Sequence, residues 1–264
     1  MKITQIIQDT YGEDLRETVL QKSASPHLDE TLSKILNYFN EWKKICKKKI
    51  IGEDRYSFAH TLLKETAYTP QEIITFFIRY QKEIECMHAD VGIFFSALVN
   101  RAQEKSSVSL EYSLHTEEFN FLIDYIGYNN NGSAITVNGP VGNRAGIEMM
   151  KGVLHLRGNA ETSLGALMKD GEIFVYGNVK DYCGTRMKGG IIHIKGNAGG
   201  CCGNEARGGK IIVEGTCGKA AGCGLNGGTL ICNGFVDTST SFGFYKKGEV
   251  YVRGTLLRGL NEEI

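Results

Sequence analysis

Cysteine is the residue type with the greatest potential for chemistry in this sequence, and it occurs eight times in 264 residues. Cys183, Cys201, Cys202 and Cys223 lie in the glycine-rich second half. Thiolates from such positions can converge on a zinc ion or an iron–sulfur cluster, although no C-x-x-C spacing occurs. The alternative is a file of buried, reduced thiols, because free cysteine is among the most buried residue types. Both interpretations stay open at the level of sequence.

Histidine offers a second possible metal site at His155 and His193, which flank Phe174 at equal spacing. If the three residues lie on successive strands about 4.8 Å apart, the two histidine backbones are about 9.6 Å apart. That separation is too large for an unaided pair of metal ligands. We therefore interpret both as surface histidines.

Gly222, Gly224 and Gly227 match G-x-G-x-x-G, the fingerprint of dinucleotide-binding loops. Such a loop opens a helix, whereas the strand-like segment 229–232 follows here. The glycines are therefore better explained by a longer glycine pattern than by a nucleotide site.

A short basic series, Lys169, Lys188 and Arg207, recurs every nineteen residues. Asp170 and Glu205 lie close to it in the sequence, so we interpret this series as solvated surface.

The glycines define the element that positions all of these residues, because three series recur with a step of nineteen residues. The series are Gly139, Gly158, Gly177, Gly196, Gly215 and Gly234; Gly146, Gly165, Gly184, Gly203 and Gly222; and Gly152, Gly171, Gly190, Gly209 and Gly228. A fixed repeat is typical of a solenoid, in which each unit buries its apolar face against its neighbours.

Apolar residues recur at four positions of this repeat and alternate with outward positions, which predicts short strands. The four columns are Leu154, Ile173, Ile192, Ile211, Leu230 and Val250; Leu156, Val175, Ile194, Val213, Cys232 and Val252; Val141, Ala160, Val179, Ala198, Cys217 and Val236; and Met149, Met168, Met187, Ala206 and Leu225. Nineteen residues are too few for a strand and a crossover helix, which take about 30. We therefore predict a parallel β-helix with glycine at corners that need positive φ or close backbone approach.

One outward column is mostly apolar, although the alternation places it toward solvent. It consists of His155, Phe174, His193, Ile212, Ile231 and Tyr251. An apolar strip of this kind predicts a cover, either the helical part of the same chain or another chain.

The runs GNVKDYCGTRMKGGIIHIKGNAGG (Gly177–Gly200) and ARGGKIIVEGTCG (Ala206–Gly218) resemble the GXGXG repeat of a known family. This family contains the C-terminal domain of the glutamate synthase large subunit and the β-helical subunit of formylmethanofuran dehydrogenase, and the phrase M-K-G-G-x-I-x-I-x-G-N-A is closer to the latter. The resemblance covers about Gly132 to Gly259. It implies a right-handed β-helix without catalytic residues, which packs against subunits or domains that hold flavin, iron–sulfur or metal centres.

Composition limits the possible partners. The thirty basic and thirty acidic side chains cancel, so no overall field favours nucleic acid or an anionic membrane. The first residues form no apolar leader, and no run approaches the 18 or so apolar residues of a membrane span. We expect a cytoplasmic protein with reduced cysteines.

Residues 1–105 contain no copy of the repeat and show helical spacing instead. One helix presents the stripe Leu28, Leu32, Ile35, Phe39, Trp42 and Cys46, and ends at Lys47–Lys49 before Gly52. A second helix begins after Asp54, and a weaker one is predicted at 13–20. The strongest signal is a heptad stripe, Ile73, Phe77, Tyr80, Ile84, Met87, Val91, Phe94 and Leu98, opened by a capping box at Thr69, Pro70 and Glu72. These helices either pack on each other or receive a partner helix.

The two ends of the β-helix are predicted to differ from its middle. Alternating residues from Val108 to Leu114 indicate an entry strand, and Gly127 indicates an imperfect first coil. At the other end, Phe242, Phe244 and Tyr245 could close the last coil and protect its edge.

The sequence thus predicts a protein of mixed α and all-β class, with an α-helical domain at 1–105 and a right-handed, single-stranded parallel β-helix at 106–264. By resemblance, it is a non-catalytic scaffold subunit or interaction domain of a multi-subunit oxidoreductase of the glutamate synthase or formylmethanofuran dehydrogenase type. A homo-oligomeric binding module and an autonomous β-helix enzyme with a surface groove are the alternatives. We assign no catalytic, cofactor-binding or metal-binding residue and no cofactor, and we expect protein partners or self-association.

Overall fold

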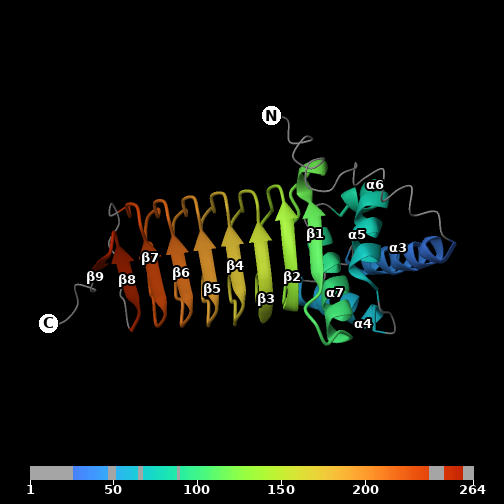
Figure 1. Ribbon diagram of the computed structural model, residues 1–264, viewed down its shortest axis with the longest axis horizontal. Coiled ribbons are helices and arrows are strands. Elements are labelled where there is room, and N and C mark those ends of the chain that lie inside the picture. The colour runs from blue at the N-terminus through green and yellow to red at the C-terminus, as the bar shows by residue number, and fades with distance from the viewer. Residues whose placement is uncertain (1–25, 47–51, 65–67, 88–89, 238–246, 258–264) are drawn as a thin grey trace.

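The computed structural model describes residues 26–46, 52–64, 68–87, 90–237 and 247–257. Helices gather at one end of a long row of strands (Figure 1). The helices are α3 (Pro26–Cys46), α4 (Gly52–Leu62), α5 (Pro70–Arg79), α6 (Gln81–Glu85) and α7 (Val91–Glu104), with a short 3-10 helix, η2 (Thr116–Glu118). The strands are β1 (Glu111–His115), β2 (Asn131–Asn138), β3 (Lys151–Leu156), β4 (Glu172–Val175), β5 (Ile191–Ile194), β6 (Lys210–Val213), β7 (Thr229–Cys232), β8 (Glu249–Val252) and β9 (Thr255–Leu257).

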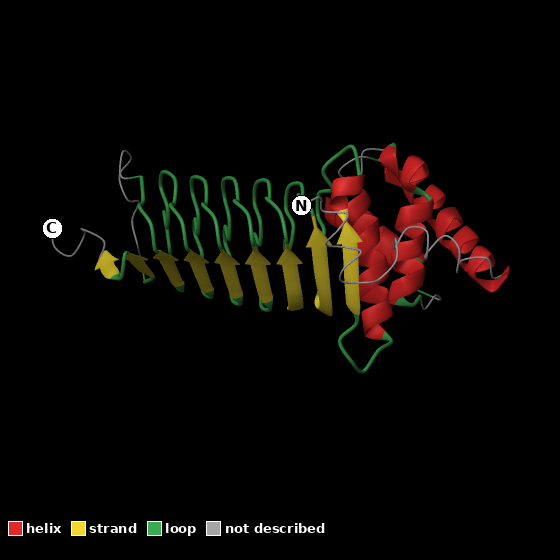
Figure 2. Ribbon diagram, turned by 45° about the horizontal axis from the view of Figure 1, so that its top comes forward, coloured by secondary structure: helices red, strands yellow, loops and turns green. Residues whose placement is uncertain are grey.

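The strands form one sheet in which each strand pairs with the next one along the chain. Strands β1 to β8 are parallel, and β9 returns antiparallel along β8. Paired residues such as Val153 and Glu172 are nineteen positions apart, whereas Thr229 pairs with Glu249 because the last coil has one extra residue. Figure 2 shows the strands as one wall of the solenoid and the loops as the rest of each coil. The predicted parallel β-helix with nineteen-residue coils is therefore confirmed.

Glycine is required at the corners for the two predicted physical reasons. Gly184 has a φ of +63°, in the left-handed region that glycine enters without steric cost. Gly196 instead lies so close to the preceding coil that an added Cβ would be 2.6 Å from the carbonyl oxygen of Gly177. The repeat also holds other residues at positive φ, at Arg144, Ser163, Tyr182, Cys201 and Ala220.

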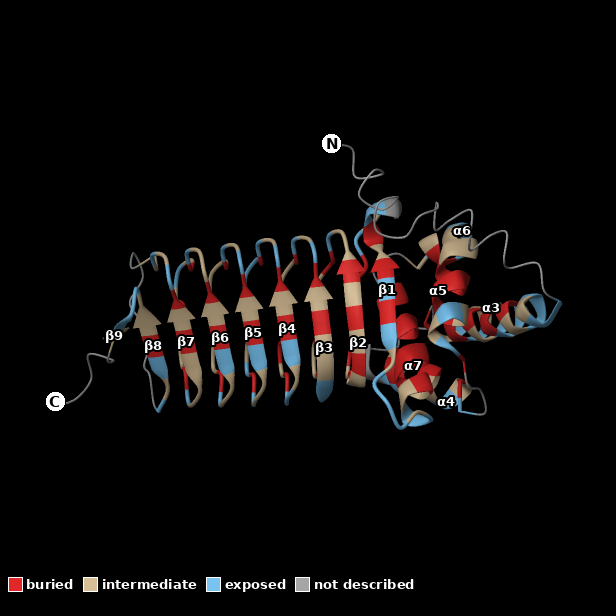
Figure 3. Ribbon diagram, viewed as in Figure 1, coloured by how far each residue is buried: buried red, intermediate tan, exposed pale blue. Residues whose placement is uncertain are grey.

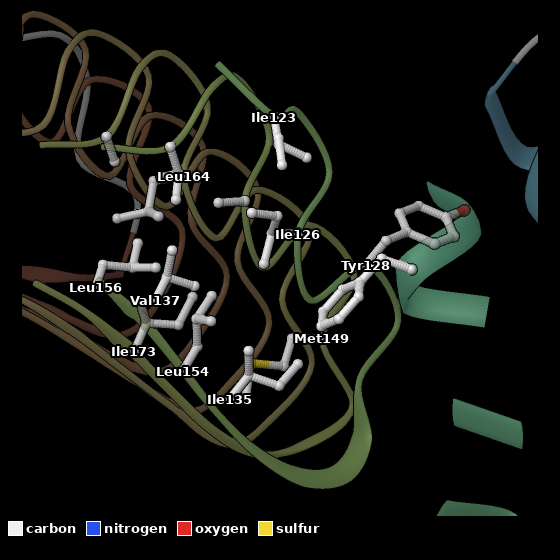
Figure 4. Packing of buried hydrophobic residues seen from close by; sticks show 14 of the residues in the cluster. Ile123, Ile126, Tyr128, Ile135, Val137, Met149, Leu154, Leu156, Leu164 and Ile173 are labelled. Atoms are coloured by element: carbon white, nitrogen blue, oxygen red, sulfur yellow. The ribbon is translucent and has the colours of Figure 1, made fainter. Parts of the chain in front are cut away.

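The four predicted apolar columns point into the solenoid, where nearly all of their members are buried. Figure 4 shows Leu154, Leu156 and Ile173 directed toward the same interior as Ile135 and Val137 of the preceding coil. The column that begins at Val141 and Ala160 forms a second parallel file of bridges from coil to coil. Each coil is thus sealed against the next on more than one side.

In the helical region, α3 buries the predicted residues from Leu32 to Cys46. The capping box is also present: the Glu72 backbone donates to Thr69, and the Thr69 backbone donates to the Glu72 carboxylate. One prediction was wrong, because the stripe from Ile73 to Leu98 does not form one helix. It is divided among α5, α6 and α7, since the backbone leaves helical geometry at Tyr80 (ψ 29°) and turns again after Glu85. The stripe is largely buried within the chain all the same, including Phe77 and Phe94.

Helix α7 joins the helices to the first coil of the solenoid. Gly92 lets the α7 backbone approach Asp124 so closely that no side chain would fit between them. The buried Asn100 side chain donates to the backbone carbonyls of Tyr128 and Asn129. Ser96 adds a bond to the carbonyl oxygen of Tyr125. Helix α7 therefore satisfies polar backbone groups of the first coil that have no earlier coil to pair with.

The two ends of the solenoid agree only partly with the predictions. The predicted entry strand is present as β1, but it begins at Glu111; Val108 is exposed and lies outside it. The first coil exists but is longer, since Glu111 pairs with Ala134. The segment 13–20, the lysines 47–49 and the aromatic residues Phe242, Phe244 and Tyr245 lie outside the described residues.

Candidate interaction face

The outward side of strands β3 to β8 carries three columns of side chains, which we call the outer face. Figure 3 shows that exposed and half-buried residues alternate with buried ones along these strands. The first column is Val153, Glu172, Ile191, Lys210, Thr229 and Glu249; the central column is His155, Phe174, His193, Ile212, Ile231 and Tyr251; the third column is Arg157, Tyr176, Lys195, Glu214, Asn233 and Arg253. Side-chain bonds show that they share one surface: Tyr251 donates to Glu249, and His193 contacts Glu214.

The central column is half-buried along its whole length, because neighbouring coils shield each side chain. The rings of His155 and Phe174 stack with centroids 5.1 Å apart, and Phe174 and His193 follow at 6.1 Å. The aliphatic side chains of Ile212 and Ile231 continue the column toward β8. The result is a continuous apolar and aromatic strip across six coils.

Charged residues flank this strip and pair from coil to coil. The Glu214 carboxylate accepts from Lys195 at 2.5 Å and lies 2.8 Å from His193 Nε2. The hydrogen bond from Lys195, together with the contact to His193, lowers the pKa of Glu214. At β5 and β6 the apolar strip therefore lies beside an ordered ion pair of the third column.

The helices do not cover the outer face, which corrects one of the two expected covers. Helix α5 packs on β1 and α7 packs on β2, at one end of the solenoid. The central column from β3 to β8 remains partly accessible. Within residues 26–46, 52–64, 68–87, 90–237 and 247–257, no segment covers the central column.

The two histidines do not form a metal site with each other, because the Phe174 ring lies between them. Across the described ranges, no three or more His, Cys, Asp or Glu side chains are arranged to hold a metal ion. This arrangement agrees with the interpretation of His155 and His193 as surface residues.

The cysteines of the predicted cluster do not come together as a set. Cys183 and Cys202 are buried in one interior column, whereas Cys201 and Cys223 are half-exposed at corners. The structure instead brings Cys183 and Cys202 into a row with two other thiols, in which Cys202 is hydrogen-bonded to Cys183 and Cys217, and Cys217 to Cys232. This favours the file of buried thiols over the cluster.

The environment of these thiols opposes ionisation. The hydrogen bond with Cys183, and then burial, raises the pKa of Cys202 well above its usual value. The bond with Cys202 raises the pKa of Cys217, and that with Cys217 raises the pKa of Cys232. Because the thiolate is the reactive and metal-binding form, these side chains act as core residues.

The remaining motifs also lie where coil geometry explains them. Gly222, Gly224 and Gly227 take positive φ at corners, and strand β7 follows them in place of a helix. Lys169, Lys188 and Arg207 are exposed. Glu205, one of the expected neutralising acids, instead forms its ion pair with Arg186 of the preceding coil at 2.8 Å.

A set of structural residues escaped the sequence reasoning. Asn159 and Asn178 each accept from the backbone N–H nineteen residues later, and Asn197 accepts from Thr216 in the same way. The signal was present, because each asparagine follows a glycine of the first series. This asparagine ladder supports the coil edge and leaves no side chain free for chemistry.

One shallow hollow of about 310 Å³ lies beside the outer face, at a corner lined by Lys151, Asp170, Glu172 and the glycines between them. A second, of about 430 Å³, lies on α3 among Asn37, Asn40 and Lys44. Neither hollow contains a histidine, serine or cysteine that could act as a nucleophile or base.

No protein-family model, curated protein or solved structure matches the chain. None of the described helices combines the length and hydrophobicity that crossing a membrane requires. The geometry of the outer face is therefore the basis for a functional assignment.

Proposed function

We propose that this protein is a non-catalytic scaffold whose outer face binds a protein partner. The observation that carries the proposal is the central column, an ordered apolar strip that the described part of the chain leaves uncovered. Covering what remains accessible of each large side chain would contribute about 1 kcal/mol, so the whole strip supports a stable contact. A rigid parallel sheet also loses little entropy on binding, because its side chains are already held by their neighbours.

The glycine repeat supports a more specific context. The coil phrase from Met187 to Ala198, with its glycine corners, resembles the GXGXG repeat of glutamate synthase and of the β-helical subunit of formylmethanofuran dehydrogenase. We infer that the chain is a structural subunit of a multi-subunit oxidoreductase of that type, in which other chains hold the redox centres. The protonated, buried thiols support a structural role for the solenoid.

The test is affinity purification of the tagged chain from its native host, with quantification of every protein that remains bound. The variant is Ile212→Ser with Ile231→Ser, and the matched control is Lys169→Ser with Lys188→Ser, on exposed positions outside the outer face. The wild type and the control should retain a bound chain in stoichiometric amount, and the isoleucine variant should lose most of it. Far-UV circular dichroism of all three establishes that they are folded.

Equal recovery of the same partners by all three proteins would contradict the proposed role of the outer face. The oxidoreductase context is tested by the same preparation, because a redox subunit brings flavin or iron–sulfur absorbance with it. A bound partner without any redox centre would be consistent with the scaffold role but would contradict the proposed membership of an oxidoreductase complex.

A further inference from the structure

We propose that the partner on the outer face is a second copy of this chain, in a dimer whose two-fold axis runs parallel to the solenoid. The inference rests on the proposed binding role of that face. It follows from the charges of the first and third columns, which are opposite in sign on the coils of β6 and β8 and are not of like sign on any other coil from β3 to β7.

Symmetry sets which residues meet. A two-fold axis parallel to the solenoid turns one outer face onto the other and keeps the coils in the same order, with the strands of the two copies antiparallel. Each coil then lies opposite the same coil of the second copy, since a closed two-fold contact is the same patch on both chains. The first column of one copy consequently faces the third column of the other.

This arrangement places opposite charges together at two levels. On the coil of β6, Lys210 faces Glu214 of the second copy, and on the coil of β8, Glu249 faces Arg253. Each pair occurs twice by symmetry. The other coils from β3 to β7 pair no like charges, because their opposed residues are Val153 with Arg157, Glu172 with Tyr176, Ile191 with Lys195, and Thr229 with Asn233.

The apolar strip meets its own copy in the same arrangement. Two sheets that pack face to face lie about 10 Å apart, which leaves room for one layer of interdigitated side chains. Phe174, Ile212 and Ile231 of the two chains would fill that layer. The constant step of nineteen residues from β3 to β7 keeps both surfaces regular enough to match over several coils.

The other face-to-face orientation fits less well. A two-fold axis along the strands reverses the coil order and sets each column against itself. Centred on the middle of the face, between β5 and β6, it places Arg157 opposite Arg253. It also pairs Lys195 with Glu214 of the second copy, so both orientations use a Glu214 that already pairs with Lys195 within each chain, and the opposed arginines distinguish them. Charge complementarity therefore selects the axis parallel to the solenoid.

The experiment uses two charge reversals, each of which should weaken the dimer by itself, whereas a mixture of the two variants should dimerise. In Lys210→Glu, residue 210 repels Glu214 of an identical copy, and in Glu214→Lys, residue 214 repels Lys210. In the mixture of the two variants, every opposed pair is again of opposite charge. Analytical ultracentrifugation of the full-length chain should show that the wild type is a dimer. The dissociation constant of each variant alone should be higher by about tenfold or more, and the equimolar mixture should again form dimers. Lys188→Glu, on an exposed corner, is the control that should leave the dimer unchanged.

A wild-type chain that is monomeric at about 100 µM, a concentration at which even weak contacts populate, would overturn the inference. The inference would also be overturned if neither charge reversal weakened the dimer, or if the mixture of the two variants did not dimerise. These failures differ from failure of the scaffold itself. Suppose the wild type is monomeric but binds a different host protein, and the Ile212→Ser and Ile231→Ser changes abolish that binding. The proposed binding role of the outer face would then stand, and a second copy would be rejected as its partner.

Discussion

The helical region and the solenoid share one hydrophobic cluster but build it by different rules. Around α3, α5 and α7 the core consists of large rings in irregular contact, such as Phe39 against Phe94 with centroids 5.2 Å apart. In the solenoid, aliphatic and small residues occupy the same places in every coil, as at Ile173, Ile192 and Ile211. The helical core depends on the shapes of individual aromatic side chains, whereas the solenoid core depends on an apolar residue at the same position of every coil.

This difference predicts how each region tolerates change. A solenoid coil contacts mainly the coils before and after it, so its stability is close to a sum of neighbour terms. A ring cluster such as that around Trp42 joins segments distant in sequence, and removing one member affects all the others. The solenoid should therefore accept the loss of a whole unit, and the helical region should not accept the loss of a single contact that fixes its orientation.

The largest expected effect comes from breaking the period. Deletion of residues 171–189 removes one complete coil and brings β3 beside β5 with every column still aligned. The protein should remain soluble, with far-UV circular dichroism typical of a sheet and a melting temperature lowered by only a few degrees. Deletion of residues 171–179 shifts all later columns out of place and should abolish soluble expression.

The two deletions serve as controls for each other, because both remove β4. Similar soluble yields would show that the nineteen-residue match does not govern folding, and the comparison between the two regions would lose its basis.

Much of the solenoid was predictable from the sequence, because a fixed period converts each residue into a place in space. The inward columns, the outward strip and the glycine corners all follow from that period. The row of thiols was predictable only in part: the period placed Cys183 and Cys202 in one column, but contact with Cys217 depends on how two walls of the coil approach each other.

The helical region was less predictable, since local pattern does not determine where a helix bends. The stripe through Tyr80, Ile84 and Met87 keeps helical spacing with no proline or glycine, so the sequence indicates one long helix. Packing of α5 on β1 and of α7 on β2 instead requires two directions, and the backbone turns to meet both. The cover of the outer face was equally undetermined, because the strip shows only that a partner is favoured.

A smaller effect is expected when the polar side chains that bond to backbone groups are removed, and it should be larger for a buried asparagine than for an exposed one. Asn100 is buried, and its side chain bonds to Tyr56 and to the carbonyl oxygens of Tyr128 and Asn129. Asn100→Ala leaves the buried Tyr128 carbonyl and the partly buried Asn129 carbonyl without these bonds, so it should lower the free energy of unfolding by about 3 kcal/mol. Asn197→Ala removes an exposed bond to the Thr216 backbone in the asparagine ladder and should cost about 1 kcal/mol or less.

Urea denaturation monitored by fluorescence of Trp42, the only tryptophan in the chain, measures the change at Asn100, and circular dichroism at β-sheet wavelengths measures the change at Asn197. A cost at Asn100 no greater than that at Asn197 would mean that α7 is not the element that secures the first coil.

The last effect depends on pH and concerns the buried thiols, which both regions contain. In α3, burial raises the pKa of Cys46 from 9.0 to about 11, and in the solenoid, hydrogen bonding with Cys183 and burial raise the pKa of Cys202 well above its usual value. A raised pKa favours the protonated thiol in the folded state. The stabilisation is therefore complete below about pH 9, and it declines above that pH as thiols of the unfolded chain ionise first.

Each such thiol should remove about 1.4 kcal/mol per pH unit in this window, and the decline due to Cys46 should end near pH 11. Urea midpoints between pH 8 and pH 10 should therefore fall less steeply in Cys202→Ala than in the wild type. Because three thiols with raised pKa values, Cys202, Cys217 and Cys232, lie in the solenoid, a transition followed by circular dichroism at β-sheet wavelengths should shift more with pH than one followed by Trp42 fluorescence. Identical shifts of the two signals would show that the helices and the solenoid unfold as one unit, and an unchanged slope in Cys202→Ala would show that its thiol is already ionisable in the folded protein.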